Sequence, residues 1–307
     1  MRFINLILAA SLPLISALES RIFSSYDGTT YVYDYVPARG DNSTFLLLHG
    51  FPSTRKEWRS HISKLTDEGH GVIVPDLLGY GDSDMPLELE AYNLKTISGH
   101  FAELVKHENI DKSYNAPGIN FDVDGFNVQG LKQLGYMPFG YWYFFNSFDA
   151  ASVLTQNLDS FFHLAFHNNA SDLPQTFCAL GAVRAWVTAN TTTPDPEWLE
   201  PGFKPLWISL FSKRDAMQAA LNYYQSFLRG YSAVDEARLT DENRKIKVPV
   251  MATGGTKDPV TRFDQLKSET EPWTTKGYTQ HAVEADHWVI LEAGDVVMDH
   301  LKNFARQ

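Results

Sequence analysis

A His-Gly-Phe-Pro turn follows the apolar run at residues 44–48 and supplies the first group that could do chemistry. Gly50 permits a turn that few other residues tolerate, and Pro52 fixes the backbone just after it. Such a turn can hold the backbone N–H of Phe51 toward a cleft, and a fixed N–H is the donor that an oxyanion hole needs. His49, Gly50 and Phe51 are therefore candidate oxyanion-hole residues, although a His-Gly turn alone is also an ordinary exit from a strand.

Two histidines four residues apart, His163 and His167, have a spacing that could place both on one metal ion. No third ligand with suitable spacing follows them in the sequence, and no His-Glu-x-x-His pattern is present. We therefore expect neither a metal centre nor a cofactor. Cys178 is the only cysteine, so the chain cannot form an internal disulfide, and a buried thiol is its expected role.

The elements that would position these groups alternate between strands and helices. The apolar run at 44–48 shows no period-2 alternation, which is typical of a strand covered on both faces in a parallel sheet. An aromatic and irregular stretch without an apolar strand then indicates a helical insertion, or cap. The expected strands are 21–25, 30–36, 44–48, 71–76, 248–253 and 280–283, and the expected helices are 58–66, 94–108 and 289–304.

The first residues have the layout of a signal peptide, which we expect to cover 1–17. The apolar segment is short and is interrupted by Pro13, so it does not suit a membrane span. Sequons at Asn42, Asn169 and Asn190 agree with a secreted, extracellular glycoprotein. The remaining expected divisions are a first part of the core at 18–117, a cap at 118–243 and a second part of the core at 244–307.

Several separated motifs resemble, in order, those of α/β-hydrolases of the epoxide hydrolase type. They are His49-Gly50-Phe51-Pro52 and the later Pro75-Asp76-Leu77-Leu78-Gly79-Tyr80-Gly81-Asp82-Ser83. The resemblance covers most of the chain and implies a doubly wound, mostly parallel sheet with a helical cap. It also implies that Asp258, in the loop after the strand at 248–253, is a triad acid, and that His287, before the last helix, is the base.

Opening an epoxide needs proton donors in addition, because charge develops on the oxygen that leaves the carbon. Tyr141 and Tyr224 resemble the two cap tyrosines that bind this oxygen in the family, although the neighbouring Tyr143 and Tyr223 leave the register open. The implied substrate is a small apolar epoxide and the implied product a vicinal diol. Esterase and dehalogenase relatives share the core but lack these donors.

The nucleophile is missing. In this fold it lies on a sharp Gly-x-nucleophile-x-Gly elbow, and the 20 glycines of the chain include no two that are four residues apart. The resemblance places the break between Lys112 and Ser113, where a βαβ unit of roughly 30 residues is absent. Asp122 and Asp124 are the nearest carboxylates, but no elbow pattern surrounds them.

We therefore expect an epoxide hydrolase-type protein whose chain as written is inactive or poorly folded. It is either an incomplete version of a working enzyme or a protein that has lost catalysis. The alternatives are a secreted binding protein that uses the cap pocket, and an esterase or dehalogenase. The formal net charge of -11 argues against nucleic acid or an anionic membrane as partner, and no membrane anchor is expected after signal removal. The sequence does not reveal the oligomeric state.

Overall fold

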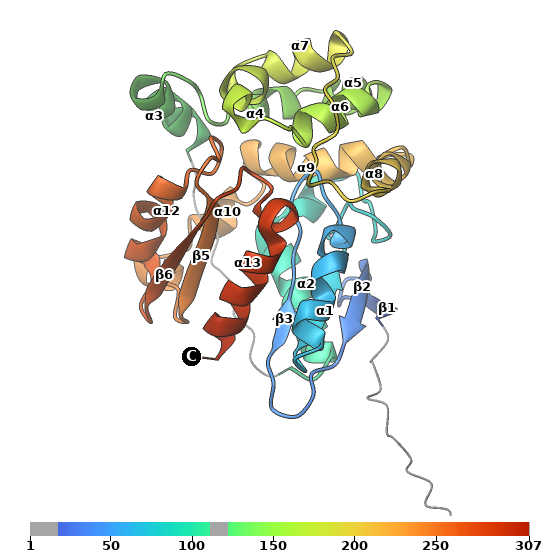
Figure 1. The fold of residues 1–307 in the computed structure, drawn as a ribbon, viewed down its shortest axis with the longest axis vertical. Helices are drawn as coiled ribbons and strands as arrows, with labels where there is room; N and C mark the ends of the chain where they lie inside the picture. The colour runs from blue at the N-terminus through green and yellow to red at the C-terminus, as the bar shows by residue number, and fades with distance from the viewer. Residues whose placement is uncertain (1–17, 111–121, 307) are drawn as a thin grey trace, which may run out of the picture.

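The computed structural model describes residues 18–110 and 122–306. The expected signal peptide at 1–17 and the break between Lys112 and Ser113 lie outside the described residues. Figure 1 shows three parts in the described chain: a sheet near the N-terminus, a second sheet near the C-terminus, and a layer of helices at one end.

The first sheet is mixed and four-stranded, with the order β1-β2-β4-β3. The β1–β2 and β2–β4 pairs are antiparallel, whereas β3 and β4 are parallel. Asp27-Gly28 supports the turn before β2, with Gly28 at a φ of 88°. The strands are β1 (Glu19–Ser24), β2 (Thr30–Val36), β3 (Thr44–Leu46) and β4 (Gly71–Pro75).

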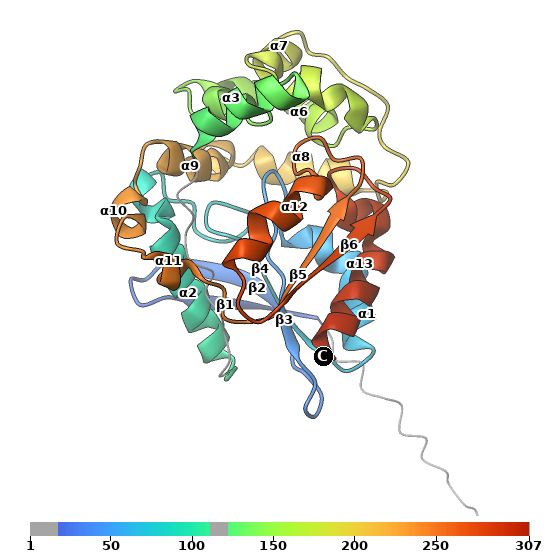
Figure 2. The same cartoon turned by 90° about the vertical axis from the view of Figure 1, so that its left-hand side faces the viewer.

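Helices cover both faces of this sheet, because β4 is apolar along its whole length and buried at every residue. Val72 and Val74 pack with residues of α1 and α13, whereas Ile73 packs in a separate cluster with residues of α2. Figure 2 shows α1 and α13 on one side of the strands and α2 on the other. The helices are α1 (Arg59–Thr66), α2 (Leu94–His107) and α13 (Val289–Ala305), with short 3-10 helices at η1 (Arg55–Trp58) and η2 (Leu89–Tyr92).

The second sheet contains the parallel strands β5 and β6. The expected helix at 289–304 forms as α13, but it is kinked at Ala293, whose φ of -140° and ψ of 37° are not helical. The kink separates the first turn of α13 from the rest of the helix. The elements of this region are β5 (Val250–Gly255), α12 (Phe263–Thr270), η5 (Glu271–Trp273) and β6 (Tyr278–Val283).

Between α2 and β5, the described residues form helices without a strand. Those from α3 to α9 lie together at one end of the molecule in both views (Figures 1 and 2), over an aromatic cluster that includes Phe145, Phe161, Phe162 and Trp207. The helices are α3 (Val123–Leu134), α4 (Tyr141–Phe145), α5 (Ala150–Gln156), α6 (Leu158–Ala165), η3 (Ala170–Asp172), η4 (Pro174–Cys178), α7 (Ala182–Thr188), α8 (Phe203–Phe211), α9 (Ala216–Leu228), α10 (Ala233–Glu236) and α11 (Asp241–Arg244).

The two sheets are not joined by hydrogen bonds within the described residues, so β3 and β5 each end a sheet. The expected strand at 44–48 forms over Thr44–Leu46, with Phe45 and Leu46 packed in the clusters on opposite faces of the sheet, but it is less buried than expected. Every residue of β3 is only half-buried, and Leu48, just beyond it, is 43% exposed. The physical reason is that an edge strand has no neighbouring strand on one side, so its apolar side chains stay partly accessible to water from that side.

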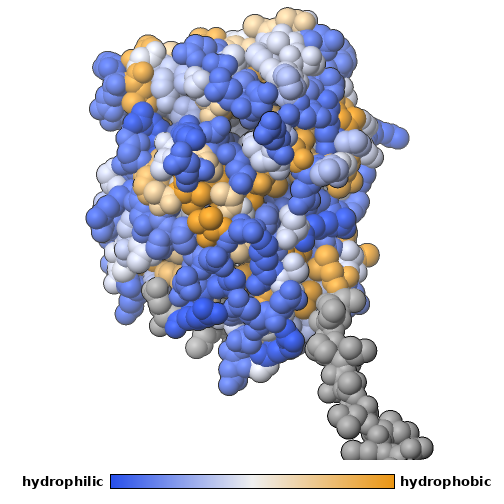
Figure 3. Space-filling view, viewed as in Figure 1, coloured by the Kyte–Doolittle hydropathy of each residue, from blue (hydrophilic) through white to orange (hydrophobic). Residues whose placement is uncertain are grey.

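Elements of the second sheet are poorly buried as well. α12 has no buried residue, and four of the six residues of β5 are only half-buried. Apolar side chains also reach the surface: Figure 3 shows them in the middle of one face, below the helical layer. Within 18–110 and 122–306, no helix is both long and apolar enough to cross a membrane.

Candidate active site

The loop after β3 carries the predicted oxyanion-hole residues and is held by the ring of His49. The Leu77 N–H donates to His49 Nε2 at 3.0 Å, so Nε2 carries no proton and Nδ1–H donates to the Gly50 carbonyl oxygen, also at 3.0 Å. Burial lowers the pKa of His49 to about 4, which keeps the ring neutral. His49 therefore joins the two loops of the family motif, and its neutral ring does not act as an acid or a base.

The predicted donor at Phe51 lies in a braced turn. The Ser53 N–H donates to the Gly50 carbonyl oxygen at 2.9 Å, and the Trp207 indole N–H of α8 donates to the Pro52 carbonyl oxygen at 2.6 Å. Among the residues the structure describes, none accepts the N–H of Phe51. The turn thus offers a free, fixed N–H, and a cap helix holds it in place.

A buried ionic cluster, missed by the sequence reasoning, lies directly behind this loop. Arg55 is 3% exposed and forms ion pairs with Asp34, Asp76 and Asp82. Asp76 also accepts the backbone N–H groups of Arg55 and Asp82, both at 3.0 Å. A Cβ at Gly81 would lie 2.0 Å from the Asp76 carboxylate, so only glycine fits there. The signal in the sequence was an aspartate at the end of an otherwise apolar strand.

The predicted base and acid are hydrogen-bonded to each other. His287 Nδ1 lies 2.9 Å from Asp258 Oδ2, and the N–H groups of Val260 and Thr261 donate to the other Asp258 oxygen at 2.7 and 3.0 Å. This leaves Nε2 of His287 available to water, and the ring is 34% exposed while Asp258 is 5% exposed. The pair has the arrangement of a triad base and its orienting acid.

The charges of the pair stabilise each other. Burial acts to lower the pKa of His287, but the hydrogen bond and charge of Asp258 outweigh it and raise that pKa above the ordinary value. Burial also opposes ionisation of Asp258, yet His287 and the two N–H donors hold the pKa of Asp258 below its usual range. The acid is thus charged at neutral pH, as its orienting role requires.

The structure distinguishes between the neighbouring tyrosines. Tyr141 and Tyr224 face each other across the cap helices α4 and α9, with ring centroids 6.3 Å apart. Tyr143 instead points outward and donates to Asp124 at 2.5 Å, and the hydroxyl of Tyr223 is buried among the core rings without a partner in the described part of the chain. Tyr141 and Tyr224 are therefore the two phenols that can share a site.

The tyrosine pair lies beside the other predicted groups. The Tyr224 ring packs edge-on against Phe51 with centroids 5.3 Å apart. Burial raises the pKa of Tyr141 well above the ordinary value, and the charge of Asp258 is near enough to add to this effect. Both phenols therefore stay protonated and can donate. Phe51, Tyr141 and Tyr224 belong to one cluster, and Val260 and Trp288, the neighbours of Asp258 and His287, pack against the same cluster.

The carboxylates considered as substitute nucleophiles have other partners. Asp122 caps the start of α3 and accepts the Gly125 N–H at 2.9 Å. Asp124 accepts the hydroxyl of Tyr143 on the outer side of the cap. Each therefore already serves the local structure of α3.

The remaining candidates from the sequence occupy separate places. His163 Nε2 lies 2.7 Å from the ammonium of Lys204, whereas His167 Nδ1 accepts the N–H of Asn169 at 3.0 Å. Within the described ranges, no group of three or more His, Cys, Asp or Glu side chains is arranged to hold a metal ion. Cys178 is fully buried, and burial raises the pKa of its thiol to about 12.

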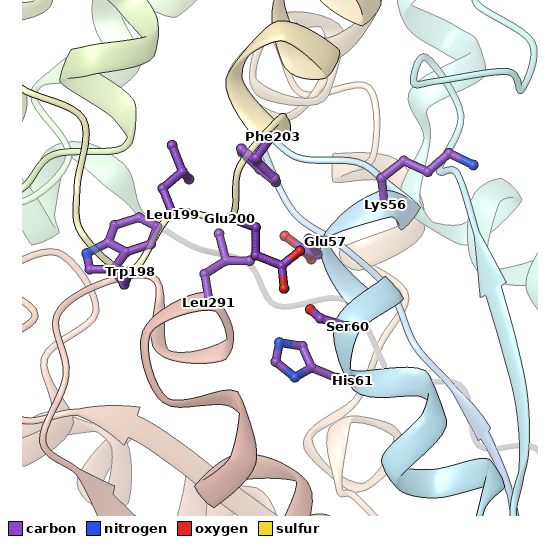
Figure 4. Close-up of a pocket in the computed structure, with 9 residues that line it drawn as sticks. All are labelled: Lys56, Glu57, Ser60, His61, Trp198, Leu199, Glu200, Phe203 and Leu291. Atoms are coloured by element: carbon purple, nitrogen blue, oxygen red, sulfur yellow. The ribbon is translucent and has the colours of Figure 1, made fainter.

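A small cavity of about 80 Å³ lies away from these groups, at the junction of α1, α13 and the segment before α8 (Figure 4). Burial raises the pKa of Glu57, one of its lining residues, to about 7. The other lining residues are Lys56, Ser60, His61, Trp198, Leu199, Glu200, Phe203 and Leu291. None of the predicted site residues lines this cavity.

Comparisons with known proteins agree on the fold of the chain. A family model described as the alpha/beta hydrolase fold matches residues 43–115. The solved structure of epoxide hydrolase A from Mycobacterium thermoresistibile superposes with a TM-score of 0.75, over 94% of this chain and 98% of that chain, at 21% identity. The solved structure of an epoxide hydrolase from Vigna radiata gives a TM-score of 0.69 at 19% identity, over the same shares of the two chains. The chain therefore has the alpha/beta hydrolase fold.

Relatives of similar length are epoxide hydrolases. The epoxide hydrolase srdG of Neurospora crassa is 25% identical, over 91% of this chain and 93% of its own length. Epoxide hydrolase A of Mycobacterium tuberculosis is 24% identical, over 84% of this chain and 89% of its own length. The Neurospora alignment spans 328 positions, more than the 307 residues of this chain, so that relative contains positions with no counterpart here.

Proposed function

We propose that this protein is built for the hydrolysis of an epoxide to a vicinal diol, and that the chain as written cannot complete the reaction because it lacks the nucleophile. The observation that carries this proposal is the grouping of Tyr141 and Tyr224 beside the hydrogen-bonded His287–Asp258 pair. The pair could serve many α/β-hydrolases. Two buried, protonated phenols serve a reaction in which an oxygen must be protonated as its bond to carbon breaks.

In the proposed reaction, a carboxylate on the elbow attacks one epoxide carbon. The C–O bond of the ring breaks as Tyr141 and Tyr224 donate to the oxygen, which takes a proton and becomes the first hydroxyl. The product of this step is an ester between the carboxylate and the opened substrate. The first step needs the missing carboxylate, so this chain would stop before it.

The second half of the reaction uses groups that this chain retains. His287, oriented by Asp258, takes a proton from water through Nε2, and the resulting hydroxide attacks the ester carbonyl. The N–H of Phe51 donates to the oxyanion that forms. Collapse of this intermediate breaks the ester and regenerates the carboxylate, and the departing oxygen takes the proton of the added hydroxide to become the second hydroxyl of the diol. The proton held by His287 returns to the phenolate left by the first step.

The missing segment offers the test. We expect the chain as written to leave a styrene-type epoxide at its background rate of hydrolysis. Insertion of the corresponding βαβ unit of the Neurospora crassa relative between Lys112 and Ser113, with aspartate at the elbow, should raise the rate by at least about 10³-fold. The matched control is the same insertion with alanine at the elbow, which should restore the fold without turnover.

Each alternative predicts a different result. Enzymatic turnover by the chain as written would overturn the proposed inactivity. A folded aspartate-bearing insertion without turnover would overturn the epoxide reaction. A serine-bearing insertion that hydrolyses esters and ignores epoxides would favour an esterase, whereas a soluble, cooperatively melting chain that binds apolar molecules without turnover would favour a binding protein.

A further inference from the structure

Glu292, in the first turn of α13, accepts two hydrogen bonds from backbone N–H groups on either side of the predicted base, His287. Its Oε2 accepts the N–H of Asp286 at 2.7 Å, and its Oε1 accepts the N–H of Trp288 at 3.1 Å. His287 lies between these two residues in the chain. One carboxylate therefore fixes the backbone immediately before and immediately after the imidazole.

We call these two hydrogen bonds of Glu292 the clamp, and the kink in α13 explains why the loop needs it. The first turn of α13 is separated from the rest of the helix at Ala293, so the main helix does not hold that turn through a continuous hydrogen-bond ladder. Trp288, the N-cap residue, makes no side-chain cap. The Glu292 carboxylate takes over this function, and a negative charge is favourable at the start of a helix.

The indole of Trp288 ties the same loop to the cap. Its N–H donates to the Ala165 carbonyl oxygen at 2.7 Å, and its ring stacks on Phe166 with centroids 4.6 Å apart. The loop is thus fixed at three points, two through Glu292 and one through the cap. A shift of the loop by 1 Å would carry His287 out of hydrogen-bond range of Asp258.

Glu292 also acts on His287 through its charge. Its negative charge adds to that of Asp258 in raising the pKa of His287. Burial raises the pKa of Glu292 itself, with His287 acting in the opposite direction. Glu292 lines a polar hollow of about 350 Å³ together with Lys257, Glu284 and Asp286. Asp258 contacts His287 from the loop after β5, and His167 of the cap lies near enough to Asp286 to be affected by its charge.

We propose that Glu292 is a positioning residue for His287: its carboxylate holds the loop that presents the imidazole to Asp258. The importance of this role for catalysis rests on the proposed function. The clamp itself does not, because it can be measured in the chain as written.

The test follows the ionisation of His287 by NMR, with histidine labelled at the ring, in the wild-type chain and in E292Q. In the variant, the glutamine carbonyl can still accept one N–H, but the charge and the second hydrogen bond are lost. We expect the pKa of His287 to fall by about 0.5 to 1 pH unit. The amide protons of Asp286 and Trp288 should also exchange faster with solvent.

Glu284 supplies the matched control, because it lies three residues before His287, is 83% exposed and pairs only with Lys257 at the surface. E284Q removes the same charge without touching the clamp and should leave the pKa of His287 within about 0.2 pH unit. If E292Q lowered the melting temperature but left the titration of His287 equal to that of E284Q, Glu292 would be a helix cap only and the proposal would be overturned.

A variant that keeps the charge covers the case in which E292Q does not fold. E292D shortens the side chain by one methylene, so it should lose the clamp while keeping most of the charge effect. Fast exchange of the Asp286 and Trp288 amide protons is expected, with a fall in the pKa of His287 that is smaller than in E292Q because the charge is kept. Unchanged exchange in E292D would contradict the clamp, whatever the activity of the chain with an inserted elbow.

Discussion

Replacing both Tyr141 and Tyr224 with phenylalanine is expected to lower epoxide opening by about 10³-fold in the chain that carries an inserted aspartate elbow. Each single replacement leaves one donor and should cost about 10- to 100-fold. The reason is that both rings face one site, with centroids 6.3 Å apart, and burial keeps both hydroxyls protonated. Single-turnover kinetics of ester formation would measure the effect on the ring-opening step alone.

Tyr143 and Tyr223 are the controls for this prediction, since each neighbours one member of the pair in sequence but points elsewhere. Y143F removes only the outward bond to Asp124 and should leave ring opening within about twofold of the parent rate. If Y143F lost as much activity as Y141F, the assignment of Tyr141 as the proton donor on α4 would be wrong. If the double variant kept full activity, the site would not open epoxides by proton donation.

Replacing Asp76 with alanine is expected to destabilise the chain by about 3–5 kcal/mol, because Arg55 would keep a buried positive charge with one fewer partner. The change would also leave the N–H groups of Arg55 and Asp82 without their acceptor. Urea denaturation followed by circular dichroism would measure the loss in the free energy of unfolding.

D82A is the control within the same cluster, because Asp82 also pairs with Arg55 but is 46% exposed. Solvent screens that pair, so D82A should cost at most about 1 kcal/mol. Equal losses in D76A and D82A would show that the buried pair is not what stabilises the oxyanion loop.

Local patterns in the sequence were sufficient to predict the strands and the helices α1, α2 and α13, but not the individual helices of the cap or α12. The strand at β4 followed from a run that is apolar at every position, and α2 followed from the period of its apolar face. The burial of β3 could not be predicted in this way. Its composition is that of a central strand, but burial depends on a neighbouring strand that the described residues do not contain.

The candidate site was predicted by residue type more completely than by geometry. Asp258 and His287 are hydrogen-bonded although 29 residues separate them, and the order of motifs was enough to pair them. The register of the tyrosines was left open, because adjacent residues on a helix point about 100° apart and the sequence does not say which face meets the core. Only the packing of α4 and α9 decides it.

Two stabilising groups were missed for a common reason. The pairing of Arg55 with Asp76 and the clamp of Glu292 both join residues that the sequence shows only as ordinary charges. The sequence offered two signals. One was an aspartate after an apolar strand, and the other was a glutamate as the fourth residue of a helix. Neither signal identifies its partner, because the partner depends on how two loops approach each other.

The transcript across the codons for Lys112 and Ser113 shows whether a site prepared for epoxide hydrolysis lacks only its nucleophile segment. We expect a longer message in which this junction is interrupted by about 30 codons or more that include Gly-x-Asp-x-Gly. If the genomic DNA and every message run directly from codon 112 to codon 113, an incomplete version of a working enzyme is ruled out, and the protein would be one that has lost catalysis.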